Sequence, residues 1–345
     1  MTKPYVLGID IGGTNTVFGI VDARGHVVAS SSIKTFKHLN FDDYVAELHD
    51  EVVRLLEANE ATDQIHGIGI GAPNANYYTG EIVNPPNLPW GDTIPLAEKV
   101  SLAFDGIPVA VTNDANAAAL GEMTYGAARG MKDFIMITLG TGVGSGIVVN
   151  GQVVYGHDGF AGELGHVIMK RNNGRICGCG RTGCLEAYCS ATGVARTARE
   201  FLEIRPDKSL LRNLDIDKIT SKDVYDAAIQ GDKLAKEIFE YTGEIMGEAF
   251  ADMIVFSSPQ AIILFGGLTK SGDLLLNPIR KSLDSHVMGI FKGKTKVVVS
   301  ELKEGDAAVL GASALGWEAK YRAVTPVAPT TTPPTATQPS YANPE

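Results

Sequence analysis

Cysteines are scarce in this chain and unevenly placed. All four lie between residues 177 and 189 of a 345-residue sequence. Disulfide-bonded secreted proteins spread paired cysteines over the chain, whereas one tight cluster in an intracellular protein is typical of a metal site. The sequence also lacks an apolar run of roughly 18 residues and an N-terminal signal-peptide pattern. We therefore predict a cytoplasmic protein with no membrane partner.

Positive charge is also in deficit. The 30 Lys and Arg residues face 40 Asp and Glu residues, which gives a formal net charge of -10. Nucleic acids select clusters of basic residues, so we predict no nucleic-acid partner. A single hydrophobic core stops growing at roughly 250–300 residues, so the chain is expected to form two lobes. Residues 324–345 are rich in Thr, Pro and Ala, which predicts a disordered tail.

Two distant segments share one pattern. Residues 5–30 contain three strand-like runs separated by glycine-bearing turns, which predicts three consecutive antiparallel strands. Residues 134–155 repeat this arrangement, with a tight Asn150-Gly151 turn before the third strand. The copies lie about 128 residues apart, and such internal similarity predicts two related lobes whose glycine turns face each other across a cleft.

Hydrophobic periodicity predicts the remaining elements. Apolar positions at helical spacing indicate a helix over 41–55, a mostly helical region over 190–258 and a final helix over 307–321. Short apolar runs indicate buried strands, and an alanine-rich helix follows the second of them. These strands are expected at 66–73, 108–114, 260–267 and 296–300.

Three glycine-rich turns follow predicted strands. One such turn is more often a tight hairpin than a ligand site. Two duplicated turns, one of them carrying Asp10, instead favour a phosphate site, because glycine lets backbone N–H groups approach an anion and a carboxylate can orient Mg²⁺. Neither turn matches the dinucleotide fingerprint or the Walker A loop. The turns are Gly12-Gly13-Thr14; Gly140, Thr141 and Gly142 within 139–146; and Gly266-Gly267, a candidate for the adenosine side.

The cysteine cluster has the composition of a closed zinc site. His166, Cys177, Cys179 and Cys184 supply four nitrogen and sulfur ligands in the order H-x10-C-x-C-x4-C. The spacing differs from that of zinc fingers, and buried free cysteines are the alternative. Cys189 follows five residues later and is expected to pack in the core. No open coordination position is indicated, so we predict a structural zinc ion.

Several carboxylates lie at positions in the sequence that are typical of catalytic or ligand-binding groups. Asn113-Asp114 ends a predicted strand and precedes a helix, where α/β proteins often place catalytic groups. An Asp at that place can equally act as a helix cap. Glu163 and Glu186 flank the cysteine cluster, which would hold them rigidly, and carboxylates are good acceptors for sugar hydroxyls.

Five motifs together resemble the ROK family (repressors, open reading frames, kinases), and most of all its bacterial glucokinase and N-acetylhexosamine kinase branch. The resemblance extends to about residue 322. It implies an α/β, two-lobed actin-like ATPase (ribonuclease H-like) fold with duplicated βββαβαβα units around a nucleotide cleft. The expected lobes are 1–112 plus 306–323, and 113–305 with the zinc motif; a homodimer or tetramer is also expected. The motifs are DIGGTN (10–15), NDANAAALGE (113–122), LGTGVGSG (139–146), GELGH (162–166) and CGCGRTGCLEAY (177–188).

The resemblance also implies residue roles in phosphorylation of a sugar by ATP. Asp114 would be the general base that accepts the proton of the 6-hydroxyl. His166 would bind zinc through one ring nitrogen and the sugar through the other. Asn87, Asn113, Glu163 and Glu186 would bind the sugar as well; Asp10, Gly12, Thr14, Thr138 and Gly142 would surround the phosphates and Mg²⁺.

Two departures from the family pattern qualify the choice of substrate. Asn74 and Asn76 lie where the family usually has a Pro-Gly pair, and this loop is expected to approach the sugar. The first nucleotide strand begins at Tyr5, so we expect no helix-turn-helix domain. Glucose is the favoured substrate, with N-acetylglucosamine, N-acetylmannosamine, mannose or fructose as alternatives. A non-catalytic sugar sensor is a different class, which the retained Asp114 disfavours.

Overall fold

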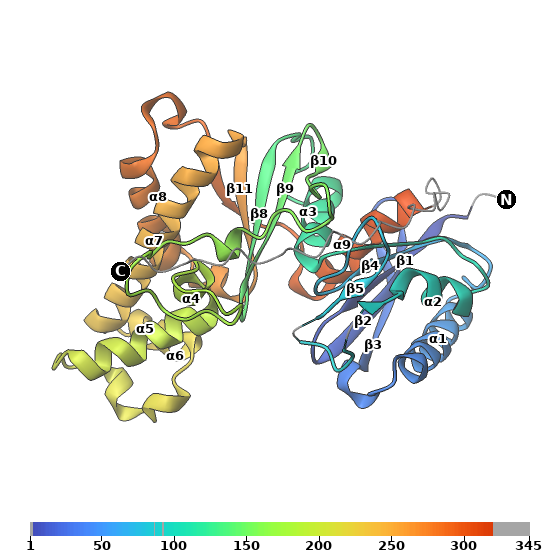
Figure 1. Cartoon of the computed structure of the whole chain (residues 1–345), viewed down its shortest axis with the longest axis horizontal. Helices are drawn as coiled ribbons and strands as arrows, with labels where there is room; N and C mark the ends of the chain where they lie inside the picture. Colours follow the sequence, from blue (N-terminus) through green and yellow to red (C-terminus); the bar gives the residue numbers. More distant parts are fainter. Residues whose placement is uncertain (1–2, 86, 92, 320–345) are drawn as a thin grey trace, which may run out of the picture.

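The computed structural model describes residues 3–85, 87–91 and 93–319. Two lobes, each built on a five-stranded sheet, lie side by side along the long axis of the molecule (Figure 1). The tail predicted at 324–345 lies outside the described residues. Within the described ranges, no helix is long and apolar enough to cross a bilayer.

The first sheet has the strand order β3-β2-β1-β4-β7. β1 pairs antiparallel with β2 and parallel with β4, so the sheet starts as a meander and continues with parallel strands reached through crossovers. Its strands are β1 (Tyr5–Ile11), β2 (Asn15–Asp22), β3 (Val27–Lys34), β4 (Ile65–Gly71) and β7 (Val109–Thr112). A separate small hairpin joins β5 (Ile82–Val83) and β6 (Thr93–Ile94).

The second sheet repeats this plan, with the order β10-β9-β8-β11-β12. β8 pairs antiparallel with β9 and parallel with β11, as β1 does with β2 and β4. The predicted duplication is therefore confirmed, and the glycine turns after β1 and β8 occupy equivalent places. The strands are β8 (Phe134–Leu139), β9 (Val143–Val149), β10 (Gln152–Val153), β11 (Ala261–Phe265) and β12 (Lys296–Val299).

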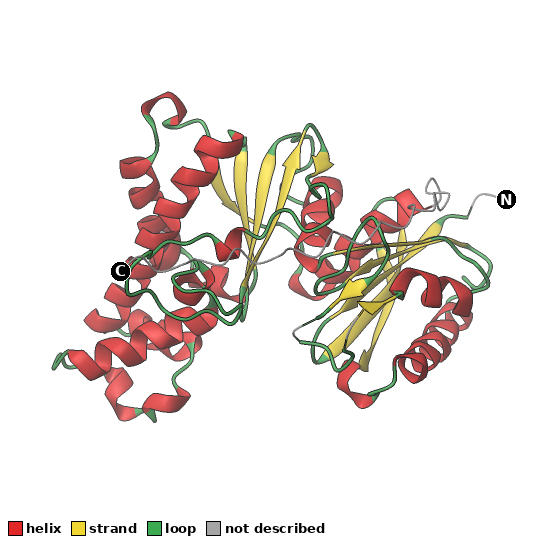
Figure 2. Cartoon of the chain, viewed as in Figure 1, coloured by secondary structure: helices red, strands yellow, loops and turns green. Residues whose placement is uncertain are grey.

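Helices α3 and α9 lie between the two sheets (Figures 1 and 2). One apolar core joins Leu120 of α3 and Leu315 of α9 to Phe134 and Ile263 of the second sheet. α1 and α2 pack on the outer face of the first sheet, and α4 to α8 belong to the second lobe. The helices are α1 (Phe41–Ala58), α2 (Leu96–Ala103), α3 (Asp114–Tyr125), α4 (Glu186–Cys189), α5 (Ala191–Ile204), α6 (Ser221–Ile229), α7 (Lys233–Ser257), α8 (Asp273–His286) and α9 (Glu304–Ala319).

Close contact between α9 and the first sheet explains the glycines in its buried strands. A Cβ atom at Gly8 would lie 2.2 Å from the Val309 carbonyl oxygen, and one at Gly69 would lie 1.9 Å from that of Ala312. Both distances are too short for nonbonded atoms, so only glycine lets the helix approach this closely. α9 thus attaches the C-terminal part of the described chain to the first sheet.

A buried carboxylate joins α3 to the segment that leads from β12 into α9. Glu122 of α3 is 0% exposed, and its Oε2 accepts a hydrogen bond from Ala127 N at 2.7 Å. Its Oε1 accepts a second from the hydroxyl of Ser300, directly after β12. Burial raises the pKa of Glu122.

Candidate active site

Asp114 is the first residue of α3, directly after β7. Asn113 is the N-cap, and its side chain accepts a hydrogen bond from Ala115 N at 2.9 Å. The capping role that was an alternative for Asp114 therefore belongs to its neighbour. Asp114 also accepts from Ala115 N, at 2.8 Å through Oδ1, which fixes the orientation of its carboxyl group.

Asp114 and Asp10 form an acidic pair at the junction of the lobes. Both line a cavity of about 170 Å³, together with Thr138 at the end of β8. Asp114 remains accessible, but protein surrounds it on most sides, and this desolvation raises the pKa of its carboxyl. Burial, with the nearby charge of Asp114 as a second cause, raises the pKa of Asp10 to about 7. The structure thus brings the predicted base beside predicted phosphate-site residues from both lobes.

The first glycine turn is closed by a bond from Gly12 N to the Asn15 carbonyl at 3.0 Å. Gly13 faces the loop that carries Asn87, because a Cβ atom there would lie 2.8 Å from the Asn87 carbonyl oxygen. Thr14 and Asn87 are both exposed. Asn87 therefore lies against the first glycine turn, which was predicted to bind phosphate.

The second and third turns meet in the second lobe. Gly140 and Thr141 line a cavity of about 560 Å³ with Gly267, a volume typical of small-molecule sites, roughly 300–1,000 Å³. Gly266 has φ 108°, and a Cβ atom there would lie 2.5 Å from the Leu139 carbonyl oxygen. Glycine is therefore required for β11 to end beside β8 and present its turn to this cavity.

The four predicted zinc donors come together. The ligand atoms of His166, Cys177, Cys179 and Cys184 all lie within 4.8 Å of one another. Cys179 Sγ lies 3.7 Å from Cys184 Sγ, and Cys177 Sγ lies 3.7 Å from His166 Nδ1. Two sulfurs on a tetrahedral zinc ion with bonds of about 2.3 Å are separated by about 3.8 Å. The donor set therefore fits zinc, and His166 turns Nδ1 toward it, which leaves Nε2 for another partner.

Glycines shape the loop that carries these donors, which we call the cysteine loop (residues 176–184). Gly183 has φ 86°, and a Cβ atom there would lie 1.9 Å from the Lys170 carbonyl oxygen. Cys177 N donates to the Arg181 carbonyl at 2.9 Å, which closes the turn between two donors. Leu185 N then donates to the Val167 carbonyl at 2.9 Å and fixes the exit of the loop beside His166.

Glu186 connects the cysteine loop to the second glycine turn. Its Oε2 accepts a hydrogen bond from Val143 N at 3.0 Å, and its Oε1 lies 3.3 Å from Cys177 Sγ. Gly142 has no room for a side chain, because a Cβ atom there would lie 2.4 Å from Glu186 Oε2. The sequence indicated Glu186 as a sugar ligand but not this contact with the second glycine turn.

Glu163 completes the cluster. Glu163 is exposed, but the protein around its carboxyl group partly desolvates it, which raises its pKa. The charge of His166 lowers this pKa, and the charges of Asp114 and Glu186 raise it. These four side chains are therefore close enough to interact electrostatically. A sugar bound among them would meet several acceptors and one imidazole.

The sequence missed a set of contacts between the lobes, which we call the tyrosine contact: Asn76, Tyr77, Tyr78 and the segment 155–159. Tyr77 stacks on Tyr155 with ring centroids 3.6 Å apart. Asn76, 3% exposed, donates to the Asp158 carbonyl at 2.6 Å, and Tyr78 Oη donates to the Gly156 carbonyl at 2.8 Å.

The predicted direct role of the asparagines in sugar choice receives no support from these contacts. The amide of Asn74 donates to the carbonyls of Val83 and Asn84, both at 3.1 Å. The amide of Asn76 is likewise occupied by backbone groups.

Comparison with known proteins places this arrangement in a class. A ROK family glucokinase from Streptomyces griseus, solved in complex with glucose and AMPPNP, has a TM-score of 0.74 and 33% identity, covering 91% of this chain and 99% of its own. A ROK family transcriptional regulator, a homologue of the E. coli MLC protein, has a TM-score of 0.81 and 26% identity, covering 92% and 78%. The fold is thus the actin-like ATPase fold of sugar kinases and related regulators.

The chain belongs to the ROK family, whose profile matches residues 6–319. Among curated relatives, the glucokinase of Halalkalibacterium halodurans is 36% identical over 327 residues, covering 93% of this chain and 97% of that protein. The resemblance inferred from the five motifs is therefore confirmed.

Proposed function

We propose that this chain is a glucokinase, which transfers the γ-phosphoryl group of ATP to the 6-hydroxyl of glucose. The single observation that carries this proposal is the position of Asp114, an accessible carboxylate beside Asp10 and Thr138. Glucokinases 34–36% identical over at least 90% of this chain support the same reaction.

Asp114 acts as the general base in this proposal. Its carboxylate accepts the proton of the 6-hydroxyl while that oxygen attacks the γ-phosphorus and the bond to the β-phosphate oxygen breaks. Its raised pKa makes it a better proton acceptor than an exposed aspartate, because the Brønsted relation favours a base whose pKa approaches the working pH.

The glycine turns act on the nucleotide. Gly12 N and Gly140 N bond within their own turns, so the phosphates meet the neighbouring N–H groups of these turns, at Gly13 in one lobe and Thr141 in the other. Gly266-Gly267 borders the adenosine side. Asp10 fits the magnesium ion of MgATP, since a carboxylate beside a phosphate turn is a ligand type that this cation prefers. When bound, the ion neutralises charge on the phosphates; positioning and charge stabilisation supply most of the catalysis in phosphoryl transfer.

The cysteine loop acts on the sugar. Zinc, when bound, cross-links His166 and the three cysteines and fixes the surrounding backbone. Glu163 and Glu186 then accept hydrogen bonds from ring hydroxyls, and His166, with Nδ1 on zinc, donates one through Nε2. Asn87 and Asn113 line the approach to the 6-hydroxyl. Because the fold holds these donors and acceptors in place, they discriminate between sugars by hydroxyl position.

A coupled ADP-release assay with MgATP against a panel of hexoses and N-acetylhexosamines tests the proposal. Glucose is expected to give the highest kcat/KM. A preference for an N-acetylated sugar would keep the reaction and overturn the choice of glucose. No turnover with any sugar would instead support a sensor, a class represented by the regulator of similar fold.

Size-exclusion chromatography with light scattering tests the predicted homodimer or tetramer. A monomer at micromolar concentration would contradict it.

A further inference from the structure

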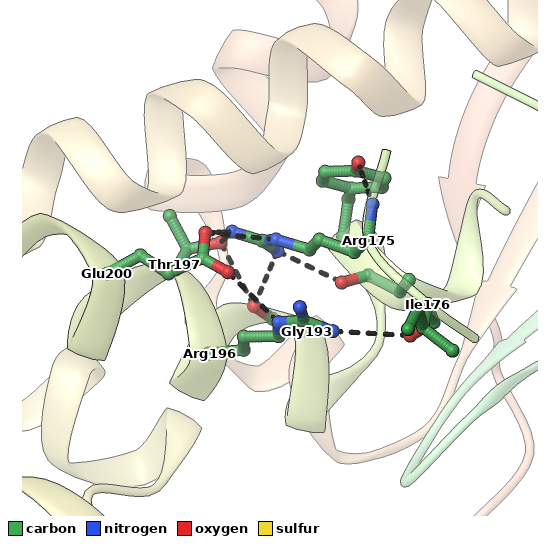
Figure 3. Close-up of polar contacts among 8 residues, drawn as sticks. Arg175, Ile176, Gly193, Arg196, Thr197 and Glu200 are labelled. Carbon is green, nitrogen blue, oxygen red and sulfur yellow. Dashed lines mark hydrogen bonds and ion pairs between the residues drawn. The ribbon is translucent and has the colours of Figure 1, made fainter. Parts of the chain in front are cut away.

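Arg175 is a buried cation with no role in the proposed reaction. Its side chain is 6% exposed and lies two residues before the zinc donor Cys177. Glu200 Oε2 accepts from Arg175 Nε at 3.1 Å and from Nη2 at 2.6 Å, and Thr197 Oγ1 accepts from Nη2 at 2.9 Å (Figure 3). The guanidinium is thereby attached to α5.

The same residue also contacts α4 and the cysteine loop. Arg175 Nη1 donates to the Ala187 carbonyl at 2.9 Å and to the Gly193 carbonyl at 3.3 Å. Its backbone N–H donates to Tyr188 Oη at 2.8 Å, and its Cζ lies 4.5 Å from the centroid of that ring. Its carbonyl accepts from Gly183 N at 2.8 Å, so one residue joins three segments.

Helix α4 depends on such contacts for its orientation. It has only four residues and no side-chain cap, and an isolated turn of that length is unstable. Its first residue is Glu186, which lies next to Ala187. The carboxylate of Glu186 is thus held by Val143 N at its tip, and the helix that carries it is held by the bond from Arg175 to the carbonyl of the next residue, Ala187.

We propose that Arg175 is a positioning residue that fixes Glu186 for sugar binding by holding α4 against α5 and the cysteine loop. This inference rests on the proposed function. The proposal depends on the several N–H donors of the planar guanidinium. A lysine at this position would provide one ammonium group, which cannot bond to Glu200, Thr197 and two carbonyls together.

The expected signature is a change in sugar affinity with nucleotide affinity preserved. In Arg175→Met, kcat/KM for the sugar should fall roughly 10- to 100-fold, as for other residues that orient a ligand-binding group. KM for ATP and the zinc content, measured by mass spectrometry, should match the wild type. Arg175→Lys should give an intermediate loss, since it keeps the charge and loses the planar guanidinium.

Arg205→Met is the matched control. Arg205 ends α5 with ion pairs to Asp207 and Glu237 and has no bond to α4 or the cysteine loop among the described residues. It should leave both KM values unchanged. If Arg175→Met does not fold, Thr197→Val, which removes one acceptor of the guanidinium, is measured in the same way and should raise the sugar KM to a smaller extent.

An unchanged sugar KM in the folded Arg175 variants overturns the inference. So does a parallel change in sugar KM, ATP KM and melting temperature, which would indicate a general structural role. If the wild type itself phosphorylates no sugar, the proposed function fails; the sugar dissociation constant, measured by calorimetry, then decides the role of Arg175 by the same comparison of variants.

Discussion

Asp114 combines a fixed orientation with a raised proton affinity. Asp114→Asn keeps the shape of the side chain and removes the proton acceptor, so kcat should fall by roughly 10²- to 10⁴-fold. The sugar dissociation constant should change little, because the amide still offers an oxygen to the hydroxyl. The coupled assay and calorimetry measure the two quantities, and Asp43→Asn, at an exposed position of α1, is the control. Near-wild-type kcat in Asp114→Asn would remove Asp114 as the base.

The pH dependence follows from the direction of the pKa shift. A general base works when deprotonated, so activity is present above its pKa and lost as the pH falls through it. Desolvation raises the pKa of Asp114 from 3.8, so the acidic limb of kcat/KM for the sugar should lie above that value. A rate profile measures it, with aliquots returned to neutral pH to exclude denaturation. A limb at or below the ordinary value would contradict the desolvated environment.

At the scale of elements, the cysteine loop lies beside the carboxylates of the proposed sugar site. Cys184→Ser should release zinc and lower kcat/KM for the sugar by roughly 10- to 100-fold, because the loop loses its cross-link. Zinc content and sugar kinetics measure the effect. Cys189→Ala is the control, since its thiol donates to the Thr242 carbonyl and lies outside the donor set. Full sugar affinity in zinc-free protein would contradict the structural role.

The tyrosine contact joins elements of the two lobes. Asn76→Ala removes a buried amide that donates to the Asp158 carbonyl and accepts from Tyr78 N and Thr79 N, which should cost about 1–3 kcal/mol of unfolding free energy. Urea denaturation measures it, with the exposed Asn172→Ala as control. Equal stability of the two variants would show that the contact contributes nothing to folding.

At the scale of the whole molecule, Glu122 is placed where the chain returns to the first lobe. Burial raises the pKa of its carboxyl, so the folded state favours the protonated form, and stability is lost as the pH rises through the folded pKa. Glu122→Gln replaces the carboxyl with an amide that does not ionise, so the variant does not lose this stability as the pH rises. Its melting temperature should exceed that of the wild type by roughly 2 °C at pH 8, with a smaller difference at pH 5. A difference that grows on acidification would contradict the sign.

Much of the architecture could be predicted from the sequence, because strand periodicity and glycine turns are local signals. The duplication, the grouping of the four predicted zinc donors and the final helix, expected over 307–321 and observed over 304–319, were found in this way. α8 was missed, since Pro278 lies inside it and weakens the helical signal. The tyrosine contact was missed because residues 76 and 158 are far apart in sequence. No local pattern indicated that Gly142 is small in order to admit Glu186.

The bond from Val143 N to Glu186 Oε2 has a thermodynamic consequence. In the proposed site, one atom of the carboxylate that binds the sugar is attached to the turn that binds the nucleotide, so the two ligands would share a structural element. Equilibrium linkage requires reciprocity: whatever factor ATP applies to the affinity for the sugar, the sugar applies to the affinity for ATP. The coupling free energy between the two substrates is therefore the same whichever of them binds first.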